Sequence, residues 1–413
     1  MKVVFASHGS LGDLVPFLEI GRILNADGHT VVIATHDAHR AAVEEAGLTH
    51  APMRPDRPND PEFHARFMAP MRGASFVFNH FLIPAIEQSD ADLMRACQGA
   101  DVLVSVTLAL AAPLVAARTG IPWRSAVFQP SMLFSIHDPP KVGMLPMVPG
   151  APRFNAYILR KAKGRVERWA KPLRRYRRSQ GLGEYPDHPA FGGQISPDGV
   201  LALYSPLFGT LPPDAPPGTI QTGQVLQTGG PPLPADLAAF LTEGPPPVVF
   251  TLGSASAHAA RSFFQDSARI AEEVGVRALL LVGRDENLKG LPETSDNFLA
   301  RPTAPYHAVF AHASAVVHQG GIGTIALAVA ASVPMVVVPF AHDQPDNAAR
   351  AVRAGVAVEL TRRGYARKGA QALSTVRTDA RMAETLREAA TTIRFEKGAE
   401  RAAAEILRAA QVR

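Results

Sequence analysis

The sequence of 413 residues contains a single cysteine, Cys97, and this scarcity excludes two kinds of structure. One cysteine forms no intrachain disulfide, and it does not supply the thiolate cluster of a Cys-rich zinc site. An apolar N-terminal run is also missing, because His8 and Asp13 follow the first apolar residues within a few positions. We therefore expect no signal peptide and a soluble, cytoplasmic protein.

Formal charge is absent between His318 and His342, a stretch long enough to resemble a membrane-spanning helix. Its first residues are rich in glycine, and Pro334 and Pro339 interrupt its second half. These residues divide the stretch into a strand, a loop, a helix and a second strand. We interpret it as buried α/β structure.

The excess of positive charge is concentrated in residues 160–178, where ten basic residues accompany one acid, Glu167. The pattern predicts a helix that breaks near Pro172. We favour a solvated helix face, because most runs of charge are of that kind. Peripheral contact with an anionic membrane, or with an acidic partner, stays open as the alternative. Nucleic acid is not an expected partner.

Short apolar runs alternate with helical patterns in both halves of the chain, which is typical of parallel sheets covered by helices. A chain of this length favours two domains. We expect an N-terminal domain at 1–205, a Pro/Gly-rich linker at 206–246 and a C-terminal domain at 247–390. A C-terminal helix at 391–413 either ends the second domain or packs back on the first. The predicted strands are 3–6, 30–34, 102–106, 124–128, 248–252, 278–282 and 315–318.

A glycine-rich loop after His318 is the clearest candidate site. It follows a predicted buried strand, contains Gly320, Gly321 and Gly323, and opens directly into a predicted helix. Glycines let the backbone approach a ligand closely, and free N–H groups at a helix start favour an anion. The loop predicts a diphosphate site, to which His318 and Thr324 would add side-chain donors. A tight turn before any helix gives a similar pattern, so the loop alone leaves a purely structural interpretation open.

Asp343 and Gln344 follow the next predicted strand at its carboxyl end. Ligands of open α/β sheets bind at that edge. The first strand is followed by Gly9-Ser10-Leu11-Gly12 rather than Gly-x-Gly-x-x-Gly. This difference argues against a nicotinamide-dependent dehydrogenase.

The motif His-x-Gly-Gly-x-Gly-Thr, followed by Asp-Gln-x-x-Asn-Ala, resembles the donor signature of UDP-glycosyltransferase-like enzymes. Segments 304–310, 251–254 and 10–16 resemble other conserved parts of that family. The resemblance extends to about residue 360 and is strongest for rhamnosyltransferase-like, sterol-glucosyltransferase-like and antibiotic-tailoring members. It implies a GT-B fold, with two facing Rossmann-like domains, and an inverting hexosyltransferase that uses a UDP- or dTDP-sugar without a metal or resident cofactor.

The resemblance also assigns roles to individual residues. His318 and the loop amides would bind the diphosphate, Ser254 would contact the phosphates, and Asp343 and Gln344 would hold sugar hydroxyls. Many plant members of the family stack a tryptophan on uracil where Thr303 or Ala304 stands here, which leaves UDP and dTDP as alternatives. The expected donor-binding residues are Gly12, Ser254, His318, Gly320, Gly321, Ile322, Gly323, Thr324, Asp343 and Gln344.

Asp13 is the expected catalytic base, because glycosyl transfer needs a group that takes the proton of the acceptor hydroxyl. The resemblance places a histidine or an aspartate at this position. An Asp13 that only caps the following helix has the same spacing, so that interpretation stays open. His8 is the second candidate base, or a residue that orients Asp13, since the pKa of histidine suits neutral pH.

Two apolar segments of the first half suggest a lipophilic small-molecule acceptor, such as a natural product, a sterol or a lipid. Ordinary core packing explains the same residues equally well. The apolar residues are Phe63, Phe67, Met68, Met71, Phe76, Phe78 and Phe81, and Met132, Leu133, Phe134, Met144, Leu145 and Met147.

Two alternative functions stay open beside glycosyl transfer. They are a sugar-nucleotide epimerase of the same fold and a catalytically silent auxiliary protein.

Overall fold

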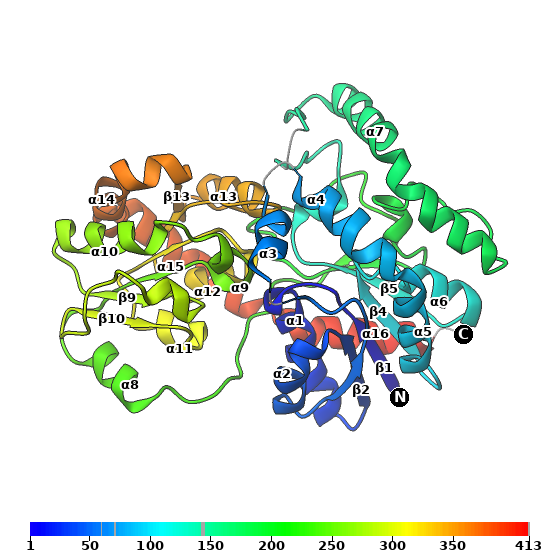
Figure 1. Ribbon diagram of the computed structural model, residues 1–413, viewed down its shortest axis with the longest axis horizontal. Helices are drawn as coiled ribbons and strands as arrows, with labels where there is room; N and C mark the ends of the chain where they lie inside the picture. Colours follow the sequence, from blue (N-terminus) through cyan, green and yellow to red (C-terminus); the bar gives the residue numbers. More distant parts are fainter. Residues whose placement is uncertain (59, 70–71, 142–144, 412–413) are drawn as a thin grey trace. The chain divides into compact units, whose positions relative to one another are not determined.

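The computed structural model describes residues 1–58, 60–69, 72–141 and 145–411, which form two compact units (Figure 1). Unit 1 consists of Met1–Phe67, Met71–Val225 and Lys397–Arg413. Unit 2 consists of Met68–Pro70 and Leu226–Glu396. Each unit contains one sheet of parallel strands, which confirms the predicted α/β class.

The sheet of unit 1 has seven strands in the order β3-β2-β1-β4-β5-β6-β7, all parallel. Its central strands are apolar on both faces because helices cover both faces. Val4 of β1, for example, is fully buried and lies between Val32 and Leu103 of the neighbouring strands. The strands are β1 (Lys2–Ala6), β2 (Thr30–Thr35), β3 (Thr49–Pro52), β4 (Val102–Val106), β5 (Trp123–Val127), β6 (Val200–Ala202) and β7 (Thr219–Gln221).

The last helix of the chain, α16 (Gly398–Gln411), belongs to unit 1 and packs against α1 and the strands β4 and β5. It approaches the backbone closely, since a Cβ on Gly398 would lie 2.3 Å from the carbonyl oxygen of Gln224. The other α-helices of unit 1 are α1 (Leu11–Ala26), α2 (Arg40–Glu45), α3 (Pro61–Phe67), α4 (Gly73–Phe76), α5 (Ile86–Ala96), α6 (Ala112–Thr119) and α7 (Pro152–Ser179).

The sheet of unit 2 has six parallel strands in the order β10-β9-β8-β11-β12-β13. The strands are β8 (Val248–Thr251), β9 (Ala278–Leu281), β10 (Phe298–Arg301), β11 (Ala315–His318), β12 (Met335–Val337) and β13 (Ala357–Glu359). The helices are α8 (Ala235–Thr242), α9 (Gly253–Ser256), α10 (Phe263–Val274), α11 (Tyr306–Phe310), α12 (Ile322–Ala330), α13 (Gln344–Arg353), α14 (Arg362–Thr378) and α15 (Ala380–Phe395). β7 and α8 both form within the proline-rich stretch 206–246.

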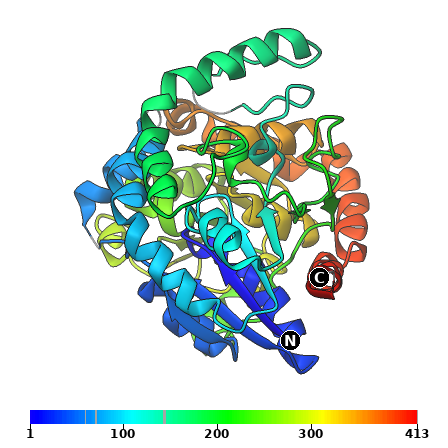
Figure 2. The same cartoon turned by 90° about the vertical axis from the view of Figure 1, so that its right-hand side faces the viewer.

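Helix α7 runs unbroken through Pro172, so the predicted break is wrong. Proline removes one intrahelical hydrogen bond, yet Pro172 lies on the exposed side of the helix, where water can satisfy the freed carbonyl. Figures 1 and 2 show α7, in green, standing away from the rest of unit 1 along much of its length. Within the described ranges, no helix is both long and apolar enough to span a membrane.

Candidate functional site

His318 ends β11 and is completely buried. Burial lowers the pKa of its ring to about 3, so the imidazole is neutral at pH 7. Its Nδ1 accepts a hydrogen bond of 3.0 Å from the amide of Gly320, which places the ring proton on Nε2. That Nε2 is buried and has no hydrogen-bond partner among the described residues. The site therefore holds a buried N–H group that donates no hydrogen bond to a described residue.

The loop after His318 leads into α12, whose N-cap is Gly321 and carries no side-chain cap. Gly320 has a φ of 94°, and a Cβ there would lie 2.9 Å from Val337 Cγ1 and 3.2 Å from the carbonyl oxygen of Gln344. Only glycine fits this position without displacing the backbone. Gly323 lies in the first turn of α12, and a Cβ added there would have no atom within 4 Å. The uncapped first turn of α12 is the positive end of a helix dipole.

Asn347, on the first turns of α13, connects the glycine loop to Asp343. Its Nδ2 donates to the carbonyl oxygen of Gly320 at 3.0 Å and to Asp343 Oδ2 at 2.6 Å, and its side chain is fully buried. The structure thus brings Asp343 next to the loop. Asn347 was not predicted as a site residue, although it stands in the Asp-Gln-x-x-Asn motif.

Gln344 is buried, and most of its hydrogen bonds are made within unit 2. Its Oε1 accepts from the amides of Phe340 at 2.8 Å and Ala341 at 3.0 Å, and its Nε2 donates to Ser256 Oγ at 3.0 Å. These bonds hold the loop after β12 against the end of α9. Gln344 therefore shapes the loop after β12. Its Nε2 carries two hydrogens and uses one for Ser256, which leaves the other for a ligand.

The short helix α9, which follows β8, begins with Gly253, which has a φ of 62°, and Ser254, which is exposed. A Cβ on Gly253 would lie 2.7 Å from Nε2 of Gln319, so the side chain of Gln319 packs directly against the backbone of Gly253. Gln319 also lies close to Gly321, where the corresponding distance is 3.0 Å. Gln319 therefore links the start of α9 to the glycine loop, a contact that the sequence pattern did not predict.

Asp13 lies in the first turn of α1 and closes a capping box with Ser10. Its Oδ2 accepts from the Ser10 amide at 2.6 Å and from Ser10 Oγ at 2.9 Å. No hydrogen bond from the described residues reaches Oδ1, and the side chain is half-buried. Gly9 makes room for it, because a Cβ there would lie 2.2 Å from Asp13 Cβ. Asp13 caps its helix and still presents one carboxylate oxygen. Its neighbour Gly12 is exposed.

His8 is 3% exposed, and neither ring nitrogen has a hydrogen-bond partner among the described residues. Burial, followed by the charges of His36 and Arg57, holds the pKa of His8 well below its ordinary value. His36 donates from Nε2 to the His8 carbonyl at 3.0 Å, and burial lowers the pKa of His36 to about 4. Of the two candidate bases, Asp13 is the accessible one.

The predicted aromatic residues of unit 1 pack around Phe63, whose ring centroid lies 5.3 Å from that of Phe76 and 5.2 Å from that of Phe81. Phe78 stacks on Trp169 of α7 at 6.0 Å. Met132 and Leu133 pack on the core formed by the carboxyl ends of β5 and β6. Met71 and Met144 lie outside the described residues. These apolar residues are largely occupied with one another.

One face of α7 is basic and exposed. Its only acid, Glu167, faces Arg174 at 3.3 Å and His188 at 3.4 Å. Phe154 and Tyr157, both nearly half exposed, lie at its first turns. The exposed basic residues that make no ion pair with a described residue are Arg153, Arg160, Lys161, Arg165, Arg168, Lys171 and Arg175.

Comparison with known proteins identifies the chain. The family model described as the erythromycin biosynthesis protein CIII-like C-terminal domain matches residues 269–411. O-mycaminosyltylonolide 6-deoxyallosyltransferase of Streptomyces fradiae is 32% identical over 97% of this chain and 96% of the relative. The chain belongs to the antibiotic-tailoring glycosyltransferases. Vancomycin aglycone glucosyltransferase of Amycolatopsis orientalis is 30% identical to this glycosyltransferase over 87% of its chain and 85% of the relative.

A solved structure, that of glycosyltransferase VinC in complex with dTDP, aligns with this glycosyltransferase over 100% of both chains. The TM-score is 0.72 at 19% identity. This likeness confirms the predicted GT-B fold. The family resemblance is also confirmed, while the roles of the individual site residues stay predictions. In the described part of the glycosyltransferase, no group of three or more His, Cys, Asp or Glu side chains is arranged to hold a metal.

Proposed function

We propose that this glycosyltransferase moves a hexose from a UDP- or dTDP-sugar to a hydroxyl of a lipophilic small molecule, with inversion at the anomeric carbon. The observation that carries the donor half is the buried Nε2–H of His318, which has no hydrogen-bond partner in the described part of the chain, beside the uncapped first turn of α12. A buried donor without an acceptor costs free energy that an oxyanion would recover. The names of the relatives support a natural-product acceptor.

The donor groups stabilise the charge that develops on the departing diphosphate. His318 supplies a neutral N–H donor, and the amides at Ile322, Gly323 and Thr324 lie at the positive end of α12. Such preorganised donors act where a metal ion acts in other transferases. The proposal therefore predicts full activity in the presence of a chelator, and loss of activity with EDTA would contradict it.

Asp13 is proposed as the base. The acceptor oxygen attacks the anomeric carbon, its proton passes to Asp13 Oδ1, and the bond between that carbon and the phosphate oxygen breaks. The electron pair of the broken bond leaves with the nucleoside diphosphate. The accessible Oδ1 supports this assignment, whereas burial of both ring nitrogens argues against His8 as the base.

The test is Asp13→Asn, which keeps an oxygen to accept the capping bonds from Ser10 but removes the basic group. We expect turnover to fall by a factor of about 100 or more while the dissociation constant for the nucleotide stays unchanged. The control is Asp27→Asn, because Asp27 is an exposed carboxylate at the other end of the same helix. Unimpaired turnover in Asp13→Asn would remove the assignment.

The nucleotide is the second point to test. The solved relative VinC was obtained with dTDP, and Thr303 offers no ring to stack on uracil. We propose dTDP-sugars as donors alongside UDP-sugars. Titration calorimetry with UDP and with dTDP measures the preference directly, and a failure of both to bind would contradict the donor site.

We further propose that the basic face of α7 binds an anionic membrane surface. Seven exposed basic residues make no ion pair with a described residue, and Phe154 and Tyr157 extend the same side of the helix. Basic residues add about 1 kcal/mol each near an anionic bilayer, and aromatic residues anchor at its interface. Because this contact is peripheral, it is lost at high salt.

Vesicle sedimentation tests the membrane proposal. The wild-type chain should pellet with vesicles containing anionic phosphatidylglycerol and stay in solution with neutral phosphatidylcholine. A triple variant, Lys161→Glu, Arg168→Glu and Arg175→Glu, should stay in solution with both. Reversing the same number of exposed charges on α14 of unit 2, including Arg367 and Lys368, is the control. Absence of pelleting by the wild-type chain would end the proposal.

A further inference from the structure

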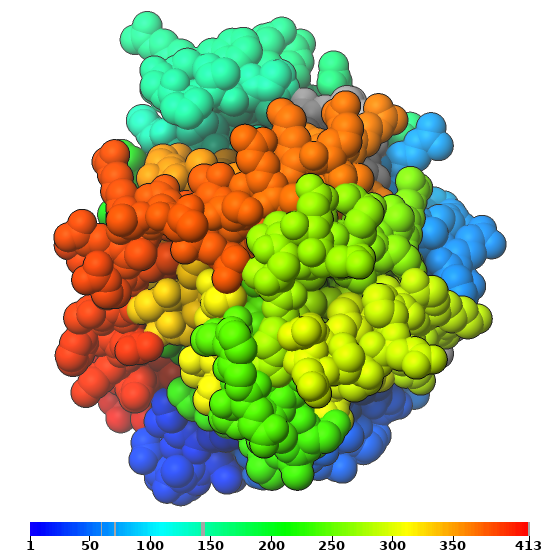
Figure 3. Space-filling model, turned by 90° about the vertical axis from the view of Figure 1, so that its left-hand side faces the viewer, coloured from blue at the N-terminus to red at the C-terminus, as the bar shows by residue number. Residues whose placement is uncertain are grey.

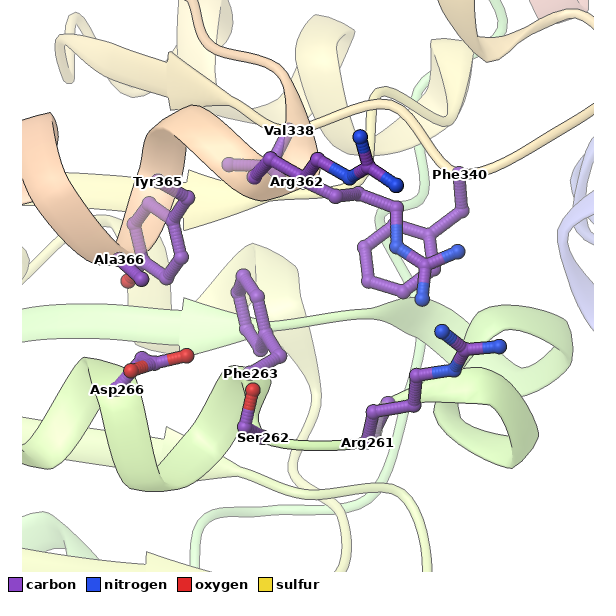
Figure 4. A pocket seen from close by; sticks show the side chains of 11 residues that line it. Arg261, Ser262, Phe263, Asp266, Val338, Phe340, Arg362, Tyr365 and Ala366 are labelled. Atoms are coloured by element: carbon purple, nitrogen blue, oxygen red, sulfur yellow. The ribbon is translucent and has the colours of Figure 1, made fainter.

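A pocket in unit 2 lies between the N-terminal ends of α10 and α14, which pack against each other. Figure 3 shows the yellow-green α10 segment against the orange α14 segment on one face of the molecule. The cavity has a volume of about 410 Å³. Aromatic rings of Phe263, Phe340 and Tyr365 line its floor, and Arg261 and Arg362 line its rim (Figure 4). Arg363 also lines the pocket.

Three arginines concentrate positive charge at this pocket. The guanidinium group of Arg362 lies over the ring of Phe340, with its carbon 4.4 Å from the ring centroid. Figure 4 shows the Arg261 side chain directed toward the same space. Burial, followed by the charge of Arg261, lowers the pKa of Arg362. The guanidinium groups of Arg261 and Arg362 therefore repel one another across the same pocket.

No carboxylate of the described residues pairs with either guanidinium group. Asp266 lines the pocket, but its carboxylate faces Arg269 at 3.8 Å. Arg261 also has a φ of 50°, in the left-handed region that non-glycine residues rarely adopt. Arg261 is exposed and Arg362 is half-buried, and neither makes an ion pair with a described residue.

The first turn of α10 adds to the same potential. This helix has 12 residues, and its N-cap, Ser262, makes no side-chain capping bond. The positive end of the helix dipole therefore lies next to Arg261 and on the wall of the same cavity, where the amide of Phe263 donates to the carbonyl oxygen of Ala260 at 3.0 Å. Guanidinium groups at the positive end of a helix favour a planar or tetrahedral oxyanion.

We propose that Arg261, Arg362 and the first turn of α10 form a second anion site, distinct from the glycine loop, that takes a carboxylate or phosphate group of a substrate. The pocket adjoins the proposed sugar site, because the amide of Phe340 donates to Oε1 of Gln344 at 2.8 Å. The carboxylate or phosphate group that binds in this pocket belongs either to the donor sugar, as in a hexuronic acid, or to the acceptor. The anion site stands without the proposed glycosyl transfer, whereas its assignment to a substrate rests on it.

The first test is a calorimetric titration of the whole chain with inorganic phosphate at constant ionic strength, in the presence of saturating UDP. UDP occupies the glycine loop, so the remaining phosphate signal reports on the second site. Arg261→Gln and Arg362→Gln should each weaken phosphate binding by about tenfold or more. Arg367→Gln, an exposed arginine on the same helix α14, is the matched control and should bind phosphate like the wild-type chain.

The second test compares UDP-glucuronate with UDP-glucose. If the anion belongs to the donor sugar, the wild-type chain prefers UDP-glucuronate and Arg362→Gln loses that preference. If it belongs to the acceptor, both donors bind alike and only phosphate binding responds to the variants. Phosphate binding that is absent from the wild-type chain, or equal in Arg362→Gln and Arg367→Gln, overturns the site. If UDP itself fails to bind, the donor proposal fails, and the phosphate titration without UDP still reports on the arginine pair.

Discussion

Gly320, in the loop after β11, and Gly323, in the first turn of α12, allow stability and ligand binding to be tested separately with the same substitution, glycine to alanine. Gly320 has a φ of 94°, with Val337 Cγ1 at 2.9 Å and a backbone oxygen at 3.2 Å from the site of a Cβ. The left-handed conformation costs alanine about 1–2 kcal/mol, and the tight contacts add about 1 kcal/mol. We therefore expect Gly320→Ala to lower the free energy of unfolding by about 2–3 kcal/mol.

Gly323 is the matched position, because its φ is not in the left-handed region and nothing lies within 4 Å of the added Cβ. Alanine is the better helix former, so Gly323→Ala should raise the stability by up to about 1 kcal/mol. If the first turn of α12 holds a diphosphate, the same methyl group occupies the space that the phosphate needs. Gly323→Ala should then bind UDP and dTDP at least tenfold more weakly.

Urea unfolding and titration calorimetry on the wild-type chain and both variants measure the two effects. Gly320→Ala is expected to lose stability and affinity together, whereas Gly323→Ala should gain stability and lose affinity. Wild-type stability in Gly320→Ala would refute the backbone argument. Wild-type nucleotide affinity in Gly323→Ala would refute the diphosphate site, because no folding defect accounts for that variant.

Three further predictions follow from other parts of the structure. Asn347→Ala removes the bonds to the Gly320 carbonyl and to Asp343, so calorimetry should show weaker nucleotide binding and urea unfolding a loss of about 2 kcal/mol; unchanged affinity would show that this link is not needed. His36 and His318 have folded pKa values of about 4 and about 3, below the ordinary 6.5, so their contribution to stability is present above pH 6.5 and is lost as the pH falls toward those values. Urea unfolding at pH 7 and pH 4 should differ by roughly 3 kcal/mol for each ring, and His36→Asn should reduce the difference; equal stability at both pH values would contradict the burial argument. Pro172→Ala should raise the helical signal and the unfolding free energy by about 1–3 kcal/mol, since it restores a hydrogen bond within α7.

The central strands were predictable from sequence because they are short, continuous apolar runs buried on both faces. The predicted runs at 3–6 and 102–106 correspond to β1 and β4 within one residue. β3 was missed because Thr49–Pro52 has almost no apolar residues and ends in proline. It lies at the edge of its sheet, where neither feature is costly. Edge strands therefore escape a search for apolar runs.

The glycine loop was predictable because positive φ values and a helix start leave a local mark on the sequence. Contacts that join distant segments leave no such mark. The contact of Gln319 with Gly253 and the bond from Gln344 to Ser256 connect residues more than 60 positions apart. The pair of Arg261 and Arg362 is of the same kind, since the two residues meet only after α10 and α14 pack together. Family motifs name the residues of a site, and tertiary packing decides which of them touch.

The packing of α16 against α1 has a consequence for biosynthesis. Unit 1 is discontinuous in the chain, because Lys397 and the residues after it follow the whole of Leu226–Glu396. A nascent chain that has released residues 1–225 from the ribosome still exposes the apolar sides of α1 and β4, which Ala402, Ala403 and Ile406 later cover. The first unit to be synthesised is thus the last to be completed. Chaperone engagement in that interval, and poor solubility of a fragment ending at residue 225, are the expected signs of this order.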